Sequence, residues 1–272
     1  MAVDMKCLIA SDLHYNLKKY DFILAAAEYV DLLILPGDFL EVSLYLDRPS
    51  QALVVDKYFQ RISRKTRLMV CSGNHDLDSR DTHGELACRW LYRARAYGIH
   101  TDGESVEVGG ALYSMCLWWD GENGKRTIAE QLDRDADRHA ARWIWLHHAP
   151  PAGSPVSWNG KRSYGDTALR DWIETHQPDF VYSGHVHQAP FVSGGSWVDR
   201  IGRTWVFNAG HQLGPVPSYV LLDSNTGSAW WKGQTGLWNI ALDAQDTCPA
   251  QVTGSAPDWV RAMDLLEVRH LR

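Results

Sequence analysis

The chain has 272 residues, of which 45% are hydrophobic and 22% are charged, and its net charge is −6 without a basic block. That length suits one large domain, or one domain with an appendage, and the charge argues against a surface that holds nucleic acid by counterion release. A nucleotide-sized ligand remains compatible with this charge. Every apolar stretch is broken well before the roughly 20 residues that a membrane span needs.

The N-terminal stretch MAVDMKCLIASD and the cysteines indicate the compartment in which the chain functions. An acidic residue precedes a short apolar run, so we expect no signal peptide and a cytoplasmic protein. The five cysteines show no CxxC spacing, which favours buried, reduced thiols over disulfides.

Short apolar runs rich in Leu, Ile and Val alternate with segments of helical period along the chain. This alternation predicts an α/β domain whose helices pack against a sheet. Strands are expected at residues 6–10, 32–35, 67–71, 143–146 and 180–183, and helices at residues 17–29, 51–63, 84–97, 126–141 and 167–176. Residues 104–119 and 191–231 contain Gly-bounded runs of β-branched and aromatic residues, which predict hairpins and therefore mixed sheets.

The chain changes character from Gly233 onward, so we divide it into one main domain, residues 1–232, and a C-terminal extension, residues 233–272. The last segment, residues 259–271, is expected to be a helix whose apolar stripe consists of Val260, Met263, Leu266 and Leu271. The stripe predicts a helix docked on its own domain, with an oligomer contact between two copies of the chain as the alternative.

Polar side chains cluster where each of the five predicted strands stops, in the stretches SDLH, PGDFLE, SGNHD, HHAPP and SGHVHQ. Because ligands of open α/β sheets bind beyond the carboxyl ends of the strands, we expect the five ends to converge on one polar crevice. The side chains they bring there are Asp12, His14, Asp38, Asn74, His75, Asp76, His147, His148, His185 and His187.

Imidazoles and carboxylates without cysteine suit borderline divalent metals such as Mn, Fe and Zn. These donors exceed the needs of one ion, whereas a pair of ions about 3.5–4 Å apart uses them naturally. Taken singly, DLH could be a turn beside a core histidine, Asp38 a helix N-cap and GNHD an Asn-containing turn. The GHVH pair resists such an explanation, because alternate strand positions send both rings to one side.

In their order, DLH at 12–14, GDFLE at 37–41, GNHD at 73–76, HHAP at 147–150 and GHVH at 184–187 resemble the motifs of the calcineurin-like metallophosphoesterases. The resemblance implies a two-sheet α/β sandwich of mixed sheets flanked by helices, with residues 1–232 as the catalytic domain. It also implies two metal ions that share one bridging carboxylate. The first ion would be held by Asp12, His14, Asp38 and His187, and the second by Asp38, Asn74, His147 and His185.

The resemblance further implies a reaction, in which a hydroxide that bridges two divalent ions attacks phosphorus in line. His75 is expected beside the leaving oxygen, with Asp76 orienting it. A set that includes both His14 and His75 is common among the phosphodiesterase members of the family, so a phosphodiester, with nucleotides among the candidates, is the predicted substrate. A phosphomonoesterase acting on a protein or small metabolite is the alternative, and a non-catalytic scaffold a more distant one.

Substrate contacts are predicted from aromatic and cationic residues between and after the metal motifs. Tryptophans can stack on a base and cations can hold a phosphate, although each of these side chains could equally have a structural role. The candidates are Trp119, Trp158, Lys161, Arg162, His148 and His211. We expect a small-molecule phosphoester as the partner, and no membrane.

Overall fold

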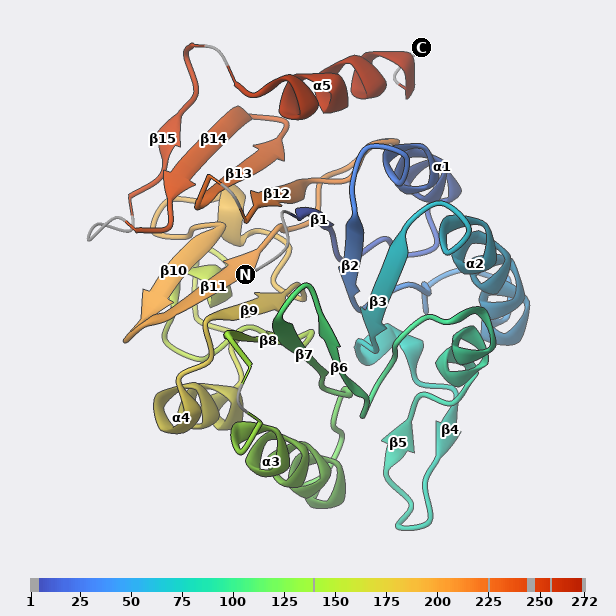
Figure 1. Cartoon of the computed structure of the whole chain (residues 1–272). Coiled ribbons are helices and arrows are strands. Elements are labelled where there is room, and N and C mark those ends of the chain that lie inside the picture. The colour runs from blue at the N-terminus through green and yellow to red at the C-terminus, as the bar shows by residue number, and fades with distance from the viewer. Residues whose placement is uncertain (1–4, 139, 225, 244–247, 255, 271–272) are drawn as a thin grey trace.

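Two mixed β-sheets pack face to face and carry helices on their outer faces, as Figure 1 shows. The structure is a computed structural model that describes residues 5–138, 140–224, 226–243, 248–254 and 256–270. It confirms the predicted α/β sandwich of mixed sheets flanked by helices. Within the described ranges no helix is long and apolar enough to cross a membrane.

The first sheet has the strand order β15-β14-β13-β12-β1-β2-β3. Its parallel strands agree with the predicted ranges to within one residue, because each is a continuous apolar run covered on both faces. The parallel strands are β1 (Lys6–Ile9), β2 (Leu32–Pro36) and β3 (Arg67–Cys71), and the antiparallel ones are β12 (Tyr219–Asp223), β13 (Ser228–Gly233), β14 (Gly236–Ala241) and β15 (Ala250–Gln251).

The second sheet has the order β10-β11-β9-β8-β7-β6. Its four inner strands run parallel and its two edge strands are antiparallel to their neighbours. The strands are β6 (Ser105–Val108), β7 (Ala111–Met115), β8 (Arg142–Leu146), β9 (Phe180–Ser183), β10 (Val198–Ile201) and β11 (Thr204–Asn208). The carboxyl ends of β8 and β9 therefore lie side by side.

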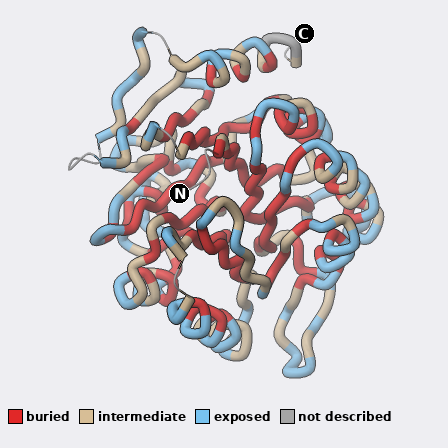
Figure 2. Tube along the Cα trace, viewed as in Figure 1, coloured by how far each residue is buried: buried red, intermediate tan, exposed pale blue. Residues whose placement is uncertain are grey.

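Helices cover the outer face of each sheet, and the buried residues concentrate along the strands between them (Figure 2). The first sheet is covered by α1 (Leu17–Ala26), α2 (Arg48–Ile62) and α5 (Asp258–His270), and the second by α3 (Glu122–Ala136) and α4 (Thr167–His176). Short 3₁₀ helices in the loops are η1 (Asn74–Asp76), η2 (Trp90–Tyr97), η3 (Pro155–Ser157) and η4 (Ala189–Phe191).

The α-helix predicted at residues 84–97 is wrong. Two short strands, β4 (Ser79–Arg80) and β5 (Leu86–Ala87), pair there as a ribbon. The turn between them contains Gly84 at φ +84°, a left-handed conformation that cannot continue a right-handed helix. The remainder, η2, is a 3₁₀ helix that buries Trp90, Leu91 and Ala94. The apolar spacing of residues 90–97 thus indicated correctly that one face is buried, but this face belongs to a 3₁₀ helix and not to an α-helix.

The C-terminal extension packs on the rest of its own chain. β13 runs across the proposed boundary at residue 232, and β14 and β15 continue the first sheet. α5 lies against α1 and buries Val260, Met263 and Leu266 in the same core, whereas Leu271 is outside the described residues. Lys232 on β13 also reaches α5, with Nζ 2.6 Å from the Asp264 carboxylate. Sheet and helix thus join the extension to the main domain.

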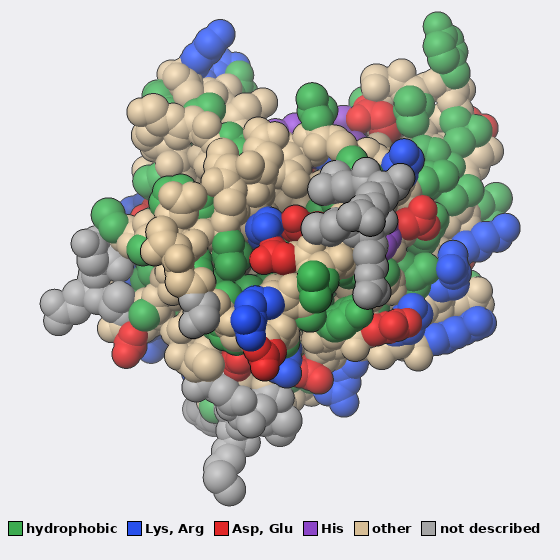
Figure 3. Space-filling model, turned by 90° about the horizontal axis from the view of Figure 1, so that it is seen from above, with side chains coloured by type: hydrophobic (Ala, Val, Ile, Leu, Met, Phe, Trp, Pro, Cys, Tyr) green, Lys and Arg blue, Asp and Glu red, His purple; other side chains and the backbone are tan. Residues whose placement is uncertain are grey.

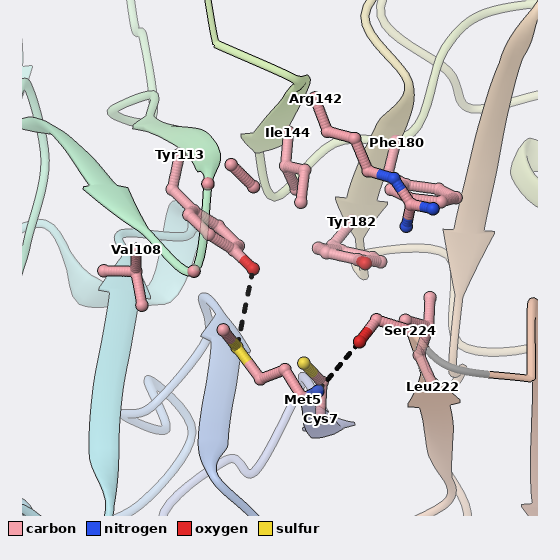
Figure 4. Close-up of a pocket in the computed structure, with 13 residues that line it drawn as sticks. Met5, Cys7, Val108, Tyr113, Arg142, Ile144, Phe180, Tyr182, Leu222 and Ser224 are labelled. Carbon is pink, nitrogen blue, oxygen red and sulfur yellow. Dashed lines mark hydrogen bonds between the residues drawn. The ribbon is translucent and has the colours of Figure 1, made fainter. Parts of the chain in front are cut away.

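The amino ends of β1, β7, β8 and β9 enclose a cavity of about 30 Å³ between the two sheets, which is too small for an organic ligand. Figure 4 shows the Tyr113 hydroxyl pointing toward the Met5 sulfur, 3.9 Å away, and the Met5 N–H donating to Ser224. Most of the surrounding side chains are apolar. Four free cysteines are buried, Cys7, Cys71, Cys88 and Cys116, whereas Cys248 is exposed, unlike the buried thiols expected.

Candidate metal centre

The loops that follow β1, β2, β3, β8 and β9 meet at one edge of the sandwich, as expected from the polar residues at these strand ends. Figure 3 shows histidine side chains in a hollow between two projections of the surface. The first sheet contributes Asp12, His14, Asp38 and Asn74, and the second contributes His148, His185 and His187.

Four side chains form what we call the first donor cluster: Asp12, His14, Asp38 and His187. One donor atom from each lies within 4.8 Å of all the others. The His187 Nε2 atom is 3.1 Å from Asp12 Oδ1 and 3.0 Å from His14 Nε2. Imidazole nitrogens and carboxylate oxygens that converge in this way can share one divalent ion.

A second donor cluster consists of Asp38, His148 and His185, again with donor atoms within 4.8 Å of one another. The His148 Nε2 atom is 3.2 Å from Asp38 Oδ2, and the His185 Nδ1 atom is 2.9 Å from the amide oxygen of Asn74. Asn74 therefore joins this cluster as a neutral oxygen donor. Asp38 belongs to both clusters.

The structure places His148, not His147, in the second donor cluster, which corrects the choice made from the sequence. The His147 ring is buried on the other side, where its Nε2 lies 3.2 Å from the Asp166 carboxylate. Successive residues of an extended chain point to opposite faces, so only one ring of the pair can face the site. We expected the first residue after β8 to face it, and the second does.

The backbone at the site adopts conformations that are unusual for residues other than glycine. Of the six such residues with positive φ in the described chain, five lie here: Asp12, His14, Tyr15, Asp38 and His185. A non-glycine residue in this region costs roughly 1–3 kcal/mol, and such residues cluster at functional sites. Four of the five belong to the donor clusters, so the backbone is strained where donor side chains must turn inward.

Two glycines of the sequence motifs are required by the close approach of the Asp12 and Asp38 carboxylates. A Cβ atom at Gly73 would lie 2.2 Å from Asp38 Oδ1, and one at Gly184 would lie 2.4 Å from Asp12 Oδ2. Neither contact is sterically allowed, so alanine at either position would displace a carboxylate from its cluster. Gly184 thus lets the β9 loop close on Asp12, whose carboxylate accepts the His185 N–H at 3.1 Å.

The charges of the site suit metal binding at neutral pH. Burial raises the pKa of Asp12, but hydrogen bonds from His14 and His187 outweigh it and hold that pKa well below its usual range. Burial lowers the pKa of His148, yet the neighbouring Asp38 carboxylate raises it to about 9. Metal binding at His148 would therefore release a proton and strengthen as the pH rises.

Glu41 and His75 lie on the outer side of the first donor cluster. The His75 Nε2 atom is 3.9 Å from Asp38 Oδ2, and its ring stands edge-on to His14. The Glu41 carboxylate reaches both rings, at 3.4 Å from His14 Nδ1 and 3.7 Å from His75 Nδ1. Glu41 thus contacts both histidines.

We expected Asp76 to orient His75, but the Asp76 carboxylate makes other contacts. Its carboxylate oxygens instead accept the backbone N–H groups of residues 38–40 and of Gly73, at 2.8–3.0 Å. These four bonds hold the loop that presents the Asp38 carboxylate to both clusters. Asp76 therefore positions the Asp38 carboxylate rather than an imidazole.

Two cavities, of about 270 Å³ and 250 Å³, open beside the metal-site histidines, and Tyr164 and His185 line both of them. The larger cavity is walled by Trp118 and Trp119. The Trp118 ring centre is 5.3 Å from that of His185. Tyr164 was not predicted from the sequence, because an aromatic residue in a loop gives no signal of the cavity it lines.

Only some of the six residues predicted to contact substrate lie at the two cavities or the donor clusters. Trp119 lines the larger cavity and donates to Asp166 at 2.7 Å, whereas Trp158 donates to the Ser193 carbonyl and lines neither cavity. Lys161 and Arg162 are exposed on one loop, and the Arg162 guanidinium carbon is 4.2 Å from the Tyr164 ring centre. Of the two histidine candidates, His148 belongs to the second donor cluster, and the His211 ring stacks on His187 at 4.7 Å.

The donor atoms fit a divalent metal. The His148 Nε2 atom is buried and makes no hydrogen bond, although Asp38 Oδ2 is 3.2 Å away. A buried imidazole that faces a carboxylate without a well-formed hydrogen bond can exchange its Nε2 proton for a metal ion. The neighbouring carboxylate and imidazoles are the other ligand types that Mn, Fe and Zn accept.

Comparison with known proteins agrees with this chemistry. A sequence profile of the family described as calcineurin-like phosphoesterase matches residues 5–189. The structure of TT1561 of Thermus thermophilus is similar, with a TM-score of 0.56 at 13% identity over 88% of this chain and 100% of that one. The purple acid phosphatase PPD1 of yellow lupin (Lupinus luteus) gives 0.56 at 15% identity over 92% of this chain and 54% of that one. At such identities these likenesses show the fold alone, and no curated protein matches.

Proposed function

Because the chain belongs to the calcineurin-like phosphoesterase family and is a metal-dependent phosphoester hydrolase, we propose that it is a binuclear enzyme that cleaves phosphodiesters. The observation that carries this proposal is the position of Asp38, which is shared by two clusters of donor atoms. A single ion would leave one cluster unused. Two ions joined by one carboxylate would use both.

The proposed ligand sets differ from the sequence prediction at one residue. Asp12, His14, Asp38 and His187 would hold the first ion, as expected. Asp38, Asn74, His148 and His185 would hold the second, with His148 in place of His147. Mn, Fe and Zn are the ions that suit these donors best.

The chain's own residues would bind and orient the substrate beside these ions. Bound there, two divalent ions would supply hydroxide near neutral pH and would neutralise the phosphoryl oxygens. We assign His75 to the leaving oxygen, because its ring lies at the rim of the first cluster and is 23% exposed, so a substrate oxygen can reach it. Glu41 would hold the His75 ring through its carboxylate.

The preference for a diester rests on the two cavities that meet at Tyr164 and His185. A diester carries an organic group on each side of phosphorus, whereas a monoester carries one. Aromatic walls at Trp118, Trp119 and Tyr164, with the Arg162 guanidinium beside Tyr164, favour a flat group such as a nucleobase. Trp158, which lines neither cavity, is no longer a preferred contact.

A phosphomonoesterase is the second candidate, and the exposed cations of the same loop favour it. Lys161 and Arg162 lie on the loop that bears Tyr164, where they could hold the second negative charge of a monoester. A protein or metabolite phosphate would then be the substrate.

One experiment separates these functions. The metal-free protein is loaded with Mn²⁺ and assayed on bis-p-nitrophenyl phosphate, p-nitrophenyl phosphate and cyclic nucleotides, with Asp38→Asn as the matched control. We expect hydrolysis of the diesters, and loss of that hydrolysis in the control. Hydrolysis of the monoester alone would replace the proposal by the second candidate, and failure to bind Mn²⁺ would favour a non-catalytic scaffold.

A further inference from the structure

Lys19, the third residue of α1, is a buried lysine without a carboxylate partner. Its side chain is 1% exposed, and none of the ion pairs of the described residues includes it. Burial lowers the pKa of Lys19 to about 8, although the charge of Asp12 opposes this shift. Burying an ammonium group without a counter-ion is destabilising, so its presence calls for a functional explanation.

The group that Lys19 contacts is the imidazole of His211. The Nζ atom lies 3.1 Å from Nδ1 and 3.4 Å from Nε2 of that ring. The Nδ1 atom is also 2.7 Å from the Asp12 carbonyl oxygen, which can only accept. Nδ1 therefore donates its proton to Asp12, and the Lys19 Nζ atom, almost equally far from both ring nitrogens, lies over the face of the imidazole.

His211 contacts two of the three segments that carry the first donor cluster. Its backbone N–H donates to the His187 carbonyl at 3.1 Å, and its ring stacks on the His187 ring with centres 4.7 Å apart. The ring also stands edge-on to His14, with centres 5.2 Å apart. His211 thus forms one wall of the first cluster and connects Asp12 to His187.

The loop that carries His211 is held to the start of α1 at a second point. The Asn16 side chain donates to the Gly214 carbonyl at 3.1 Å. Gly210, at φ +71°, allows the approach, because a Cβ atom there would be 2.9 Å from the His187 carbonyl oxygen. The first turn of α1 and this loop therefore meet at the first cluster, where Lys19 is enclosed.

We propose that Lys19 is a positioning residue that acts through His211. It holds the His211 imidazole against His187 and Asp12, and it places a buried positive charge behind the first donor cluster. Such a charge would stabilise negative charge that develops on the phosphoryl group, because Lys19 is itself buried and water screens its charge weakly. The kinetic part of this inference rests on the proposed phosphoesterase function.

The first test compares Lys19→Met with Lys18→Met, since Lys18 is the exposed neighbour on the same helix. With Mn²⁺ and bis-p-nitrophenyl phosphate, we expect kcat to fall roughly 10- to 100-fold in Lys19→Met, as for groups that orient metal ligands, and to stay unchanged in Lys18→Met. The melting temperature of metal-free Lys19→Met should equal or exceed that of the wild type, because the buried ammonium is gone. Wild-type kcat, or a lower melting temperature with lost activity, would overturn the proposal.

The second test is a double-mutant cycle with His211→Ala. If Lys19 acts through His211, Lys19→Met should reduce kcat much less in the His211→Ala background than in the wild type. Equal reductions in both backgrounds would show that Lys19 acts independently, and would contradict the positioning role.

A third measurement does not depend on activity. In ¹H–¹⁵N spectra of the histidine rings, the Nδ1 proton of His211 should be protected from exchange in the wild type and in Lys18→Met, and lost in Lys19→Met. A protected signal in all three proteins would overturn the inference about Lys19. If the wild type binds Mn²⁺ but hydrolyses none of the substrates, the proposed function fails, and this ring signal alone decides whether Lys19 positions His211.

Discussion

The two ends of the sheet sandwich share strands β1, β8 and β9 but differ in what they bury. At the amino ends of β1, β7, β8 and β9, mostly apolar side chains surround a cavity of about 30 Å³ (Figure 4). At the carboxyl ends of β1, β2, β8 and β9, buried carboxylates and imidazoles crowd together on a backbone with positive φ. The amino end thus consists mainly of packed apolar side chains. The carboxyl end instead contains strained backbone and buried charged groups.

This difference indicates what metal binding contributes. Asp12, Asp38 and His148 are each at most 1% exposed, and one nitrogen of His148 makes no hydrogen bond. Desolvation of these groups is costly and their mutual pairing offsets part of that cost, so an ion that binds only the folded state would add further stability. We therefore expect mutations at the carboxyl end to reduce activity and metal affinity. Mutations at the amino end should reduce mainly the stability of the fold.

The largest effect is expected from Asp38→Asn, which removes the carboxylate shared by both clusters. Turnover of a diester should fall by on the order of 10⁴ or more, because the charge stabilisation that the metal pair supplies amounts to several kcal/mol. Metal content measured by atomic emission should fall from two ions per chain. Two retained ions would argue against the shared-carboxylate arrangement.

His75→Ala should reduce turnover by roughly 10² to 10⁴, the usual contribution of a positioned acid–base group. Both metals should stay bound, since His75 lies outside the two donor clusters that share Asp38. Steady-state kinetics and metal analysis of the same sample test this. Unchanged turnover would remove His75 from the leaving-group position.

The histidine pair after β8 offers a comparison within one dipeptide. His148→Ala should weaken binding of one Mn²⁺ on the order of 100-fold, since even groups that only orient ligands contribute that much. His147→Ala should leave both ions bound but destabilise the fold, because the ring is buried against Asp166. Calorimetric Mn²⁺ titration and thermal unfolding of both variants measure this, and the reverse pattern would restore His147 as the ligand.

The smallest effect is expected at the amino end, from Ile144→Val in the wall of the small cavity. Removing one buried methylene there should cost about 1 kcal/mol, which lowers the melting temperature by roughly 2–4 °C. Neither kcat nor Mn²⁺ affinity should change, since Ile144 lies on β8 within the sheet core, away from the loop that carries His148. A loss of activity without a loss of stability would show that the two ends are coupled.

The sequence determined the strands and most of the site because both depend on local order. A buried strand needs a continuous apolar run, and a site at the strand ends needs donors immediately after it, so both features lie within a few adjacent residues. The expected strands differ from the observed ones by at most one residue at either end. The proposed ligands, apart from the one after β8, follow directly from these motifs.

Three other features depend on tertiary packing, and the sequence alone could not predict them. Which of His147 and His148 faces the donor clusters depends on the direction in which the chain leaves β8, and composition does not encode this. The helical spacing at residues 84–97 marked a buried face, but the turn at Gly84 chose a ribbon and a 3₁₀ helix instead. Lys19 and His211 are far apart in the sequence, and the packing of α1 against the loop after β11 brings them together.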